Sequence, residues 1–369
     1  MPRTLLPVAM PADPSTPRPF RLSIYLALAY LLLVAYASLS PLGGWRLVEG
    51  DWLRFVTAPW PRYWTVADLA INALAYFPLG FLIGLSAPRR WPRWAVVALA
   101  TLLGLLTSFA METAQQAVPG RVASNLDLMS NGAGALAGAL AAAAALSRPA
   151  TLTALVGLRD RWLDSGHLTD AALVLVALWC FGQANPALPW MATRVFEGAL
   201  TASARDPAAA FSLLAMALSL TCTLAVAMTL KVVVPPERRR LLLAAAPAVV
   251  SALVKSIAAV ALLRQEATLR WLTVESVVGV GYGIAFAWLA LRHSQRVQAA
   301  VGVAAAVAAI VLAYGFEPAA SPSAVMRLFS WRYGHLLNFN GLTRLVAELW
   351  PMAAIVFLAL VLRLRARAR

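Results

Sequence analysis

Charged side chains are scarce in this chain: 13% of its 369 residues are charged, whereas 61% are hydrophobic. Soluble globular domains carry about 25% charged residues and about 45–50% apolar ones. The mean hydropathy of +0.73 is correspondingly high. These values exclude an ordinary soluble domain and indicate an integral membrane protein.

Cysteine and histidine are also rare, with two and three residues respectively. Cys180 and Cys222 fall in apolar stretches without an evident partner, so we interpret them as small core residues and expect no disulfide framework. His167, His293 and His335 have no second His or Cys nearby at metal-ligand spacing. We therefore predict no metal site and no cofactor.

Motifs typical of enzymes and of nucleic-acid-binding modules are missing. The sequence has no HExxH motif, no Ser–His arrangement and no phosphate-binding glycine loop, which weighs against an enzyme. The net charge of +15 would suit nucleic acid, but the basic residues form neither a basic face nor an aromatic-basic module. We predict no nucleic-acid partner and interpret basic clusters such as PPERRRLLL as contacts with anionic membrane lipids.

Long apolar runs recur along the whole chain. A run such as LALAYLLLVAYASL is apolar on every side, which fits a membrane helix and not the alternating strand of a membrane barrel. One helical span takes about 20 residues. We predict an all-α fold, a polytopic transmembrane helical bundle of about ten spans, near residues 20–40, 66–86, 94–117, 127–147, 168–186, 208–234, 241–263, 271–291, 297–315 and 346–363.

The distribution of basic residues predicts the orientation of this bundle, because short loops rich in Lys and Arg stay in the cytoplasm. With a cytoplasmic N-terminus, 19 basic residues fall in cytoplasmic segments and 11 in the opposite, longer segments. We therefore expect both termini to be cytoplasmic. The first apolar run exceeds the core of about 7–15 residues that is usual in a cleaved signal peptide, so we expect an uncleaved anchor.

Changes in composition divide the chain into four parts. We expect a disordered cytoplasmic tail at residues 1–19, a four-span domain at 20–147, a cytoplasmic amphipathic linker at 148–167 and a six-span membrane domain at 168–369. The external loop at about 316–345 contains SWRYGHLLNFNGLTRL, which is either a surface helix or part of a binding surface.

Polar residues of the first block gather near the external end of three spans. They come from Asp68-Leu-Ala-Ile-Asn72 and from METAQQAVPGRVASNLDLMSNGAG at 111–134. An ionisable residue within a span costs about 2.5–3.5 kcal/mol on insertion scales and usually faces a bundle interior or a water-filled cavity. We therefore predict a ligand-binding site made of Asp68, Asn72, Glu112, Gln115, Arg121, Asp127 and Asn131.

Helix capping offers a competing interpretation for part of this cluster. Ser124 and Asp127 match a capping box, and Asp68 suits a helix N-terminus. Arg121 could pair with Glu112 or with a lipid phosphate. Capping explains neither the whole cluster nor its position at one depth in the membrane. We therefore favour a ligand-binding site over a purely structural role for these residues.

A short repeat accompanies the cluster. Asp68 and Asn72 open the second span, and Asp127 and Asn131 open the fourth, with each pair on one helix face. Glycines follow in both spans, where backbones can approach closely: Gly80 and Gly84, then Gly134 and Gly138. A duplicated two-helix hairpin is one explanation, and chance matching is the other.

Together these residues resemble a known family. The string Glu112-Thr-Ala-Gln115, Pro-Gly-Arg121, Ser124, Asp127, Asn131, Gly134 and Gly138, preceded by Asp68, Asn72 and Tyr76-Phe77-Pro78-Leu79-Gly80, resembles the VanZ-like family over about residues 20–147. The resemblance implies a bacterial multi-pass protein of the cytoplasmic (inner) membrane. The family takes its name from a member associated with low-level resistance to the glycopeptide teicoplanin. The resemblance implies no known reaction and does not extend to residues 168–369.

The net charge of the predicted site limits the classes of ligand that we expect it to bind. Three carboxylates against one arginine leave the cluster at about −2, and two helix N-termini return only about +0.5 each. A bare phosphate fits poorly, whereas sugar hydroxyls, amides, an ammonium group or a phosphate carried with a divalent cation fit better. We predict an accessory protein related to envelope or glycopeptide resistance, with an outward-facing site for a glycan or cell-wall precursor headgroup.

Two other functional classes stay open. A transporter could use Lys255 and Glu275, which lie in consecutive antiparallel spans with an axial offset of about 6 Å, although an internal ion pair is the simpler interpretation. A membrane-embedded enzyme acting on a lipid-linked headgroup could use Glu112 or Asp127 as general acid or base, with Arg121 stabilising developing charge.

Overall fold

The computed structural model describes residues 21–40, 42–46, 50–148, 150, 154, 157, 163, 166–197, 211–232, 234, 240–330 and 335–367. Within these residues the fold is all-α, and β-structure is limited to two isolated bridges, Phe196–Ala319 and Leu263–Phe329. The predicted fold class is confirmed. The predicted tail at 1–19 lies outside the described residues, as does most of the predicted linker at 148–167.

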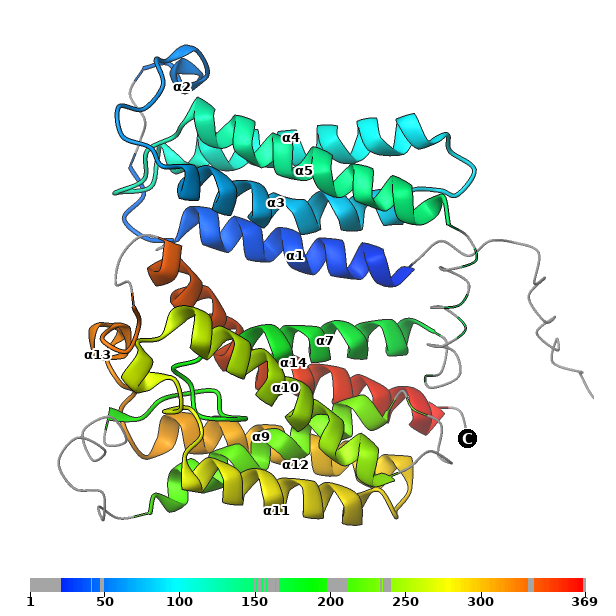
Figure 1. Ribbon diagram of the computed structural model, residues 1–369. Helices are drawn as coiled ribbons and strands as arrows, with labels where there is room; N and C mark the ends of the chain where they lie inside the picture. The colour runs from blue at the N-terminus through cyan, green and yellow to red at the C-terminus, as the bar shows by residue number, and fades with distance from the viewer. Residues whose placement is uncertain are drawn as a thin grey trace, which may run out of the picture.

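Long helices account for most of the described chain (Figure 1). They are α1 (Arg21–Leu39), α3 (Val66–Ser86), α4 (Arg93–Gln115), α5 (Asn125–Leu146), α7 (His167–Gln183), α9 (Leu213–Lys231), α10 (Arg240–Leu262), α11 (Val274–Ala290), α12 (Gln295–Gly315) and α14 (His335–Arg367). Short helices are α2 (Arg54–Thr57), α13 (Pro322–Met326) and the 3-10 turn Gln265–Ala267. Apart from α14, each long helix begins within a few residues of a predicted span.

Eight of these helices are long and apolar enough to cross a bilayer, as judged by length and composition. The two others, α7 and α11, are apolar but have 17 residues each. That length is at the lower limit of about 17–25 residues for a span. A polytopic bundle is therefore confirmed, and the described helices comprise eight candidate spans and two shorter apolar helices at the places of the ten predicted spans.

Helix α14 differs most from the prediction, because its 33 residues start at His335 whereas the last span was expected at 346–363. The first turns contain polar residues that lower the hydropathy of this stretch, which is why the sequence suggested a loop. Two of them are buried: Asn340 accepts a 2.8 Å hydrogen bond from Asn185, and the Thr343 hydroxyl donates to the Phe339 carbonyl. The stretch is thus a helix inside the bundle.

The bundle has two halves that lie side by side (Figure 1). Helices α1, α3, α4 and α5 form the first half, and α7, α9, α10, α11, α12 and α14 form the second. Helix α1 packs against α7 and α14, so the two halves meet along α1. The C-terminal end of α1 and the N-terminal end of α14 lie at the same end of the bundle (Figure 1).

Helices α3 and α5 pack backbone against backbone. A Cβ added at Gly134 would collide with the Ala73 carbonyl, and one added at Gly138 would collide with the Phe77 carbonyl. Gly80 is equally close to the Ala135 carbonyl. The expected close approach at these glycines is confirmed, and it holds the middle turns of α3 and α5 together.

Replacing Gly134 by Ala should therefore destabilise the protein, even though Ala is the better helix former. The new methyl group cannot fit without moving the α3 backbone, and such overpacking costs about 1–3 kcal/mol. Gly281 of α11 is the matched control, because nothing lies within 4 Å of its added Cβ. Gly281→Ala should be neutral or stabilising by up to about 1 kcal/mol. Thermal unfolding in detergent compares them; an unchanged midpoint for Gly134→Ala would contradict the packing.

The expected orientation can be tested with single cysteines and a membrane-impermeant thiol reagent in intact cells. The free thiols Cys180 and Cys222 are first replaced by Ala. Val122, which is 81% exposed, lies at the end of the bundle expected outside, and exposed Arg90 lies at the opposite end. We expect Val122→Cys to be labelled and Arg90→Cys to be labelled only after lysis. The reverse result would invert the predicted orientation.

Candidate functional site

A cavity of about 850 Å³ occupies the end of the bundle where α1 and α4 end and α3, α5 and α14 begin. All seven residues of the predicted site line it: Asp68, Asn72, Glu112, Gln115, Arg121, Asp127 and Asn131. The structure thus brings together residues from three helices and one loop of the first half. Their role in binding remains a prediction.

The N-termini of α3 and α5 are capped, as the sequence suggested. Thr65 and Asp68 form a complete capping box at α3, with a 3.1 Å bond in each direction. At α5 the Ser124 hydroxyl accepts from the backbone amides of Leu126 and Asp127, at 3.1 and 3.4 Å. Capping therefore explains Ser124 and part of Asp68, in agreement with the competing interpretation.

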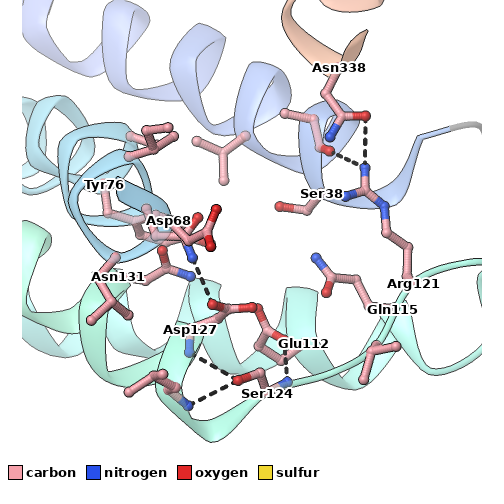
Figure 2. A pocket seen from close by; sticks show the side chains of 18 of the residues that line it. Ser38, Asp68, Tyr76, Glu112, Gln115, Arg121, Ser124, Asp127, Asn131 and Asn338 are labelled. Carbon is pink, nitrogen blue, oxygen red and sulfur yellow. Dashed lines mark hydrogen bonds between the residues drawn. The ribbon is translucent and has the colours of Figure 1, made fainter. Parts of the chain in front are cut away.

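The predicted box at α5 is completed by a different residue. The Ser124 backbone amide donates to Glu112 Oε2 at 3.0 Å, and Glu112 comes from α4 (Figure 2). Asp127 Oδ1 instead accepts a 2.7 Å hydrogen bond from Asn72 of α3. Three side chains assigned to a binding site, those of Asn72, Glu112 and Asp127, therefore also connect helices.

Several polar groups on the cavity wall have unused hydrogen-bonding capacity. Tyr76 and Asn131 are 4% and 5% exposed, and within the described part of the chain neither the tyrosine hydroxyl nor the Asn131 Oδ1 atom has a hydrogen-bond partner. Asn131 Nδ2 donates to Ser108 at 2.9 Å. Among the described residues, Glu112 has a partner on Oε2 alone and the Gln115 side chain has none. An unsatisfied buried polar group costs about 1–3 kcal/mol, so these groups favour a bound polar ligand.

Arg121 contacts α1 and α14, and within the described chain it forms no ion pair with Glu112, which was one of the two partners that the sequence suggested. Its Nε donates to the Ser40 carbonyl at 3.2 Å, while one terminal nitrogen donates to the Ala37 carbonyl at 2.8 Å and to Asn338 Oδ1 at 3.3 Å (Figure 2). The last carbonyls of a helix lack intrahelical partners, so the guanidinium caps α1. Burial lowers the pKa of Arg121 and the charge of Glu112 raises it, but arginine stays charged.

The second half contributes wall residues that the sequence did not assign to the site. They are Phe181 of α7 and Asn338, Phe339 and Leu342 of α14. The signal for the three α14 residues was the stretch SWRYGHLLNFNGLTRL, for which a binding surface was one of two interpretations, whereas Phe181 lies outside that stretch. Residues 331–334 of that stretch lie outside the described chain.

These features define a multi-pass α-helical membrane protein with a polar cavity at one end of its bundle. Residues 15–146 match the model of the VanZ/LLP1 family, which confirms the resemblance over the first half. The remainder of the chain lies outside that match. Comparison with curated proteins gave no match, and neither did comparison with solved structures.

In the second half, Lys255 and Glu275 do not form the predicted pair. Lys255 is fully buried and donates to the backbone carbonyls of Asn185 at 2.7 Å and Leu188 at 3.1 Å. Glu275 accepts a 3.4 Å hydrogen bond from the Ser212 amide. The sequence predicted the position of both residues along the helix axes, but it did not predict the direction in which each side chain points. Lys255 instead supports the carbonyls of a buried loop, which must find donors inside the bundle.

A double-mutant cycle tests this assignment. Glu275→Gln should change the free energy of unfolding by no more than about 0.5 kcal/mol, because the amide oxygen can still accept from Ser212. Lys255→Met should cost about 1–3 kcal/mol, since two buried carbonyls lose their donor. The two effects should add within about 0.5 kcal/mol. A coupling above about 1 kcal/mol in denaturant unfolding would restore the ion pair.

Proposed function

We propose that this protein is a VanZ-like accessory protein of the bacterial cell envelope, related to teicoplanin-type glycopeptide resistance. Its cavity would bind the polar headgroup of a glycan or of a cell-wall precursor. The observation that carries the proposal is the convergence of seven polar residues on one cavity, where the Tyr76 hydroxyl and Asn131 Oδ1 have no hydrogen-bond partner among the described residues.

The size and lining of the cavity support a small-molecule site. Its volume of about 850 Å³ falls in the range of about 300–1,000 Å³ that ligand pockets occupy. Such pockets combine apolar walls with a few convergent polar groups. Here the polar groups come from α3, α4 and α5, and aromatic residues such as Trp64, Phe181 and Phe339 supply apolar surface.

The expected orientation is consistent with this proposal, because it would put the cavity on the external side, which faces the cell wall. The alternatives lose support. Lys255 and Glu275 no longer suggest a relay for transport, since they have separate partners. Arg121, the cation offered for catalysis, is engaged by three oxygen atoms.

Glu112→Gln separates a binding role from an architectural one. The glutamine oxygen can still accept from the Ser124 amide, so the variant should accumulate in the membrane at near-normal level. If the charge serves binding, the variant should nevertheless have the phenotype of the deletion. Growth of a complemented deletion strain on envelope-active antibiotics, including teicoplanin, measures this. Asn131→Ser should show a milder loss, because a hydroxyl keeps only part of the amide's bonding.

Thr273→Ala is the matched control, since Thr273 caps α11 away from the cavity. Loss of this cap should cost about 0.5–2 kcal/mol and lower abundance, with resistance falling only as far as abundance does. If Glu112→Gln and Asn131→Ser fall on the same line relating abundance to resistance, the polar cluster is architectural and the proposed function is wrong.

A further inference from the structure

The polar groups of the cavity wall are sorted by depth. The charged side chains on its described wall lie in loops or in the terminal turns of helices: Arg62, Asp68, Glu112, Arg121 and Asp127. The uncharged residues Tyr76 and Asn131 lie deeper in the bundle. Tyr76 follows Asp68 by eight residues of α3, or about 12 Å, and Asn131 follows Asp127 by four residues of α5, or about 6 Å. The described wall is therefore uncharged at the inner end of the cavity.

Hydrogen bonds within the protein leave this inner end incompletely satisfied. The Tyr76 hydroxyl and Asn131 Oδ1 are buried, and neither has a hydrogen-bond partner among the described residues. Ser38 and Ser108 lie near the hydroxyl without reaching hydrogen-bond geometry. Asn131 Nδ2 donates to Ser108 at 2.9 Å, which fixes the amide while its oxygen stays unused. An unsatisfied buried polar group destabilises a folded protein, so packing alone explains neither group.

The chemistry of these two groups limits what can satisfy both. A tyrosine hydroxyl donates as well as accepts, whereas an amide oxygen only accepts. A sugar hydroxyl or an N-acetyl amide offers an acceptor to Tyr76 and a donor to Asn131. An ammonium group cannot accept from the hydroxyl, and a carboxylate cannot donate to the amide oxygen. Burying either charge against an uncharged wall also carries a desolvation cost. The inner end therefore favours an uncharged group with both functions.

The Tyr76 side chain is held in place by its surroundings. It belongs to a buried apolar cluster with Val34 of α1, Leu79 of α3 and Ala135 of α5. Figure 2 shows Tyr76 and Asn131 on neighbouring helices, with Arg121 at the opposite side of the view. Because three helices fix the tyrosine ring, its hydroxyl needs little reordering to bind a ligand, which lowers the entropic cost of binding.

We propose that Tyr76 and Asn131 form the innermost subsite of the cavity, and that this subsite binds an uncharged sugar-type group through a hydroxyl or an N-acetyl amide. This inference rests on the proposed function and narrows its ligand class. Any charged part of the ligand stays at the outer end, beside the charged side chains. The inference also gives a binding role to Tyr76, which the sequence placed in the family resemblance alone.

Tyr76→Phe gives the first test, because it removes the hydroxyl and keeps the ring. Without a ligand, the full-length variant in nanodiscs should unfold at the temperature of the wild type or above it, since no described group loses a hydrogen bond. Thr101→Val is the matched control. The Thr101 hydroxyl is also buried without a described partner, but it lies at a separate apolar groove between α4 and α5. A lower midpoint for Tyr76→Phe would give the hydroxyl a structural role and overturn the inference.

Binding is then measured with octyl N-acetylglucosaminide and octyl glucosaminide, below their micellar concentrations and against empty nanodiscs. The two probes differ in one substituent, an N-acetyl amide in place of an ammonium group. The wild type should bind the uncharged probe more tightly. Tyr76→Phe should weaken that binding about two- to tenfold, which corresponds to one neutral hydrogen bond. Asn131→Ser should weaken it as well, whereas Thr101→Val should bind both probes like the wild type.

The outcomes separate this inference from the function on which it rests. Equal or tighter binding of the ammonium probe overturns the uncharged subsite. Unchanged binding of the uncharged probe by Tyr76→Phe also overturns it, because water would then satisfy the hydroxyl. The same holds if neither probe binds the wild type. Each of these results leaves a site at the carboxylate end of the cavity in place. The proposed function fails separately, when resistance of Glu112→Gln and Asn131→Ser follows abundance alone.

Discussion

The close approach of α3 and α5 is the constraint on which the cavity depends. Gly134 and Gly138 let the α5 backbone touch the carbonyls of Ala73 and Phe77. That contact lies directly beyond Asn72 and Asp127, whose side chains can therefore meet at 2.7 Å. A larger residue at either glycine would push the helices apart and open this hydrogen bond. The small residues within the spans therefore determine whether the polar residues at the helix ends can contact each other.

This polar cluster can both hold the helices together and bind a ligand. Glu112 and Asn131 each use some of their hydrogen-bonding atoms for contacts within the protein and leave others to the cavity. Glu112 uses one oxygen to complete the cap of α5 and leaves the other to the cavity. Asn131 donates to Ser108 and keeps an unpartnered oxygen. The contacts that are made fix the side-chain positions, so the remaining atoms are held ready. Preorganisation of this kind lowers the entropic cost of binding a ligand.

The sequence predicted the helices and the cluster well because both depend on local patterns. A span is recognised by the apolar run that forms it, and a cap by residues three positions apart. Contacts between segments that are distant in the sequence were harder to predict. Lys255 bonds to a loop 67–70 residues away, and Arg121 reaches Asn338 across 217 residues. Such partners depend on how each helix is rotated about its axis, which hydropathy does not specify.

The second half of the chain has a physical reason to be joined to the first. The family-matched half supplies the carboxylates, but without α7 and α14 the side of the cavity next to α1 and Arg121 would be open to lipid. Helices α7 and α14 cover that side, and Asn338 Oδ1 accepts a third hydrogen bond from the guanidinium. Arginine is among the most costly residues to expose to hydrocarbon. The first turns of α14, polar enough to resemble a loop, therefore close the cavity and supply a hydrogen-bond acceptor to the half-buried Arg121.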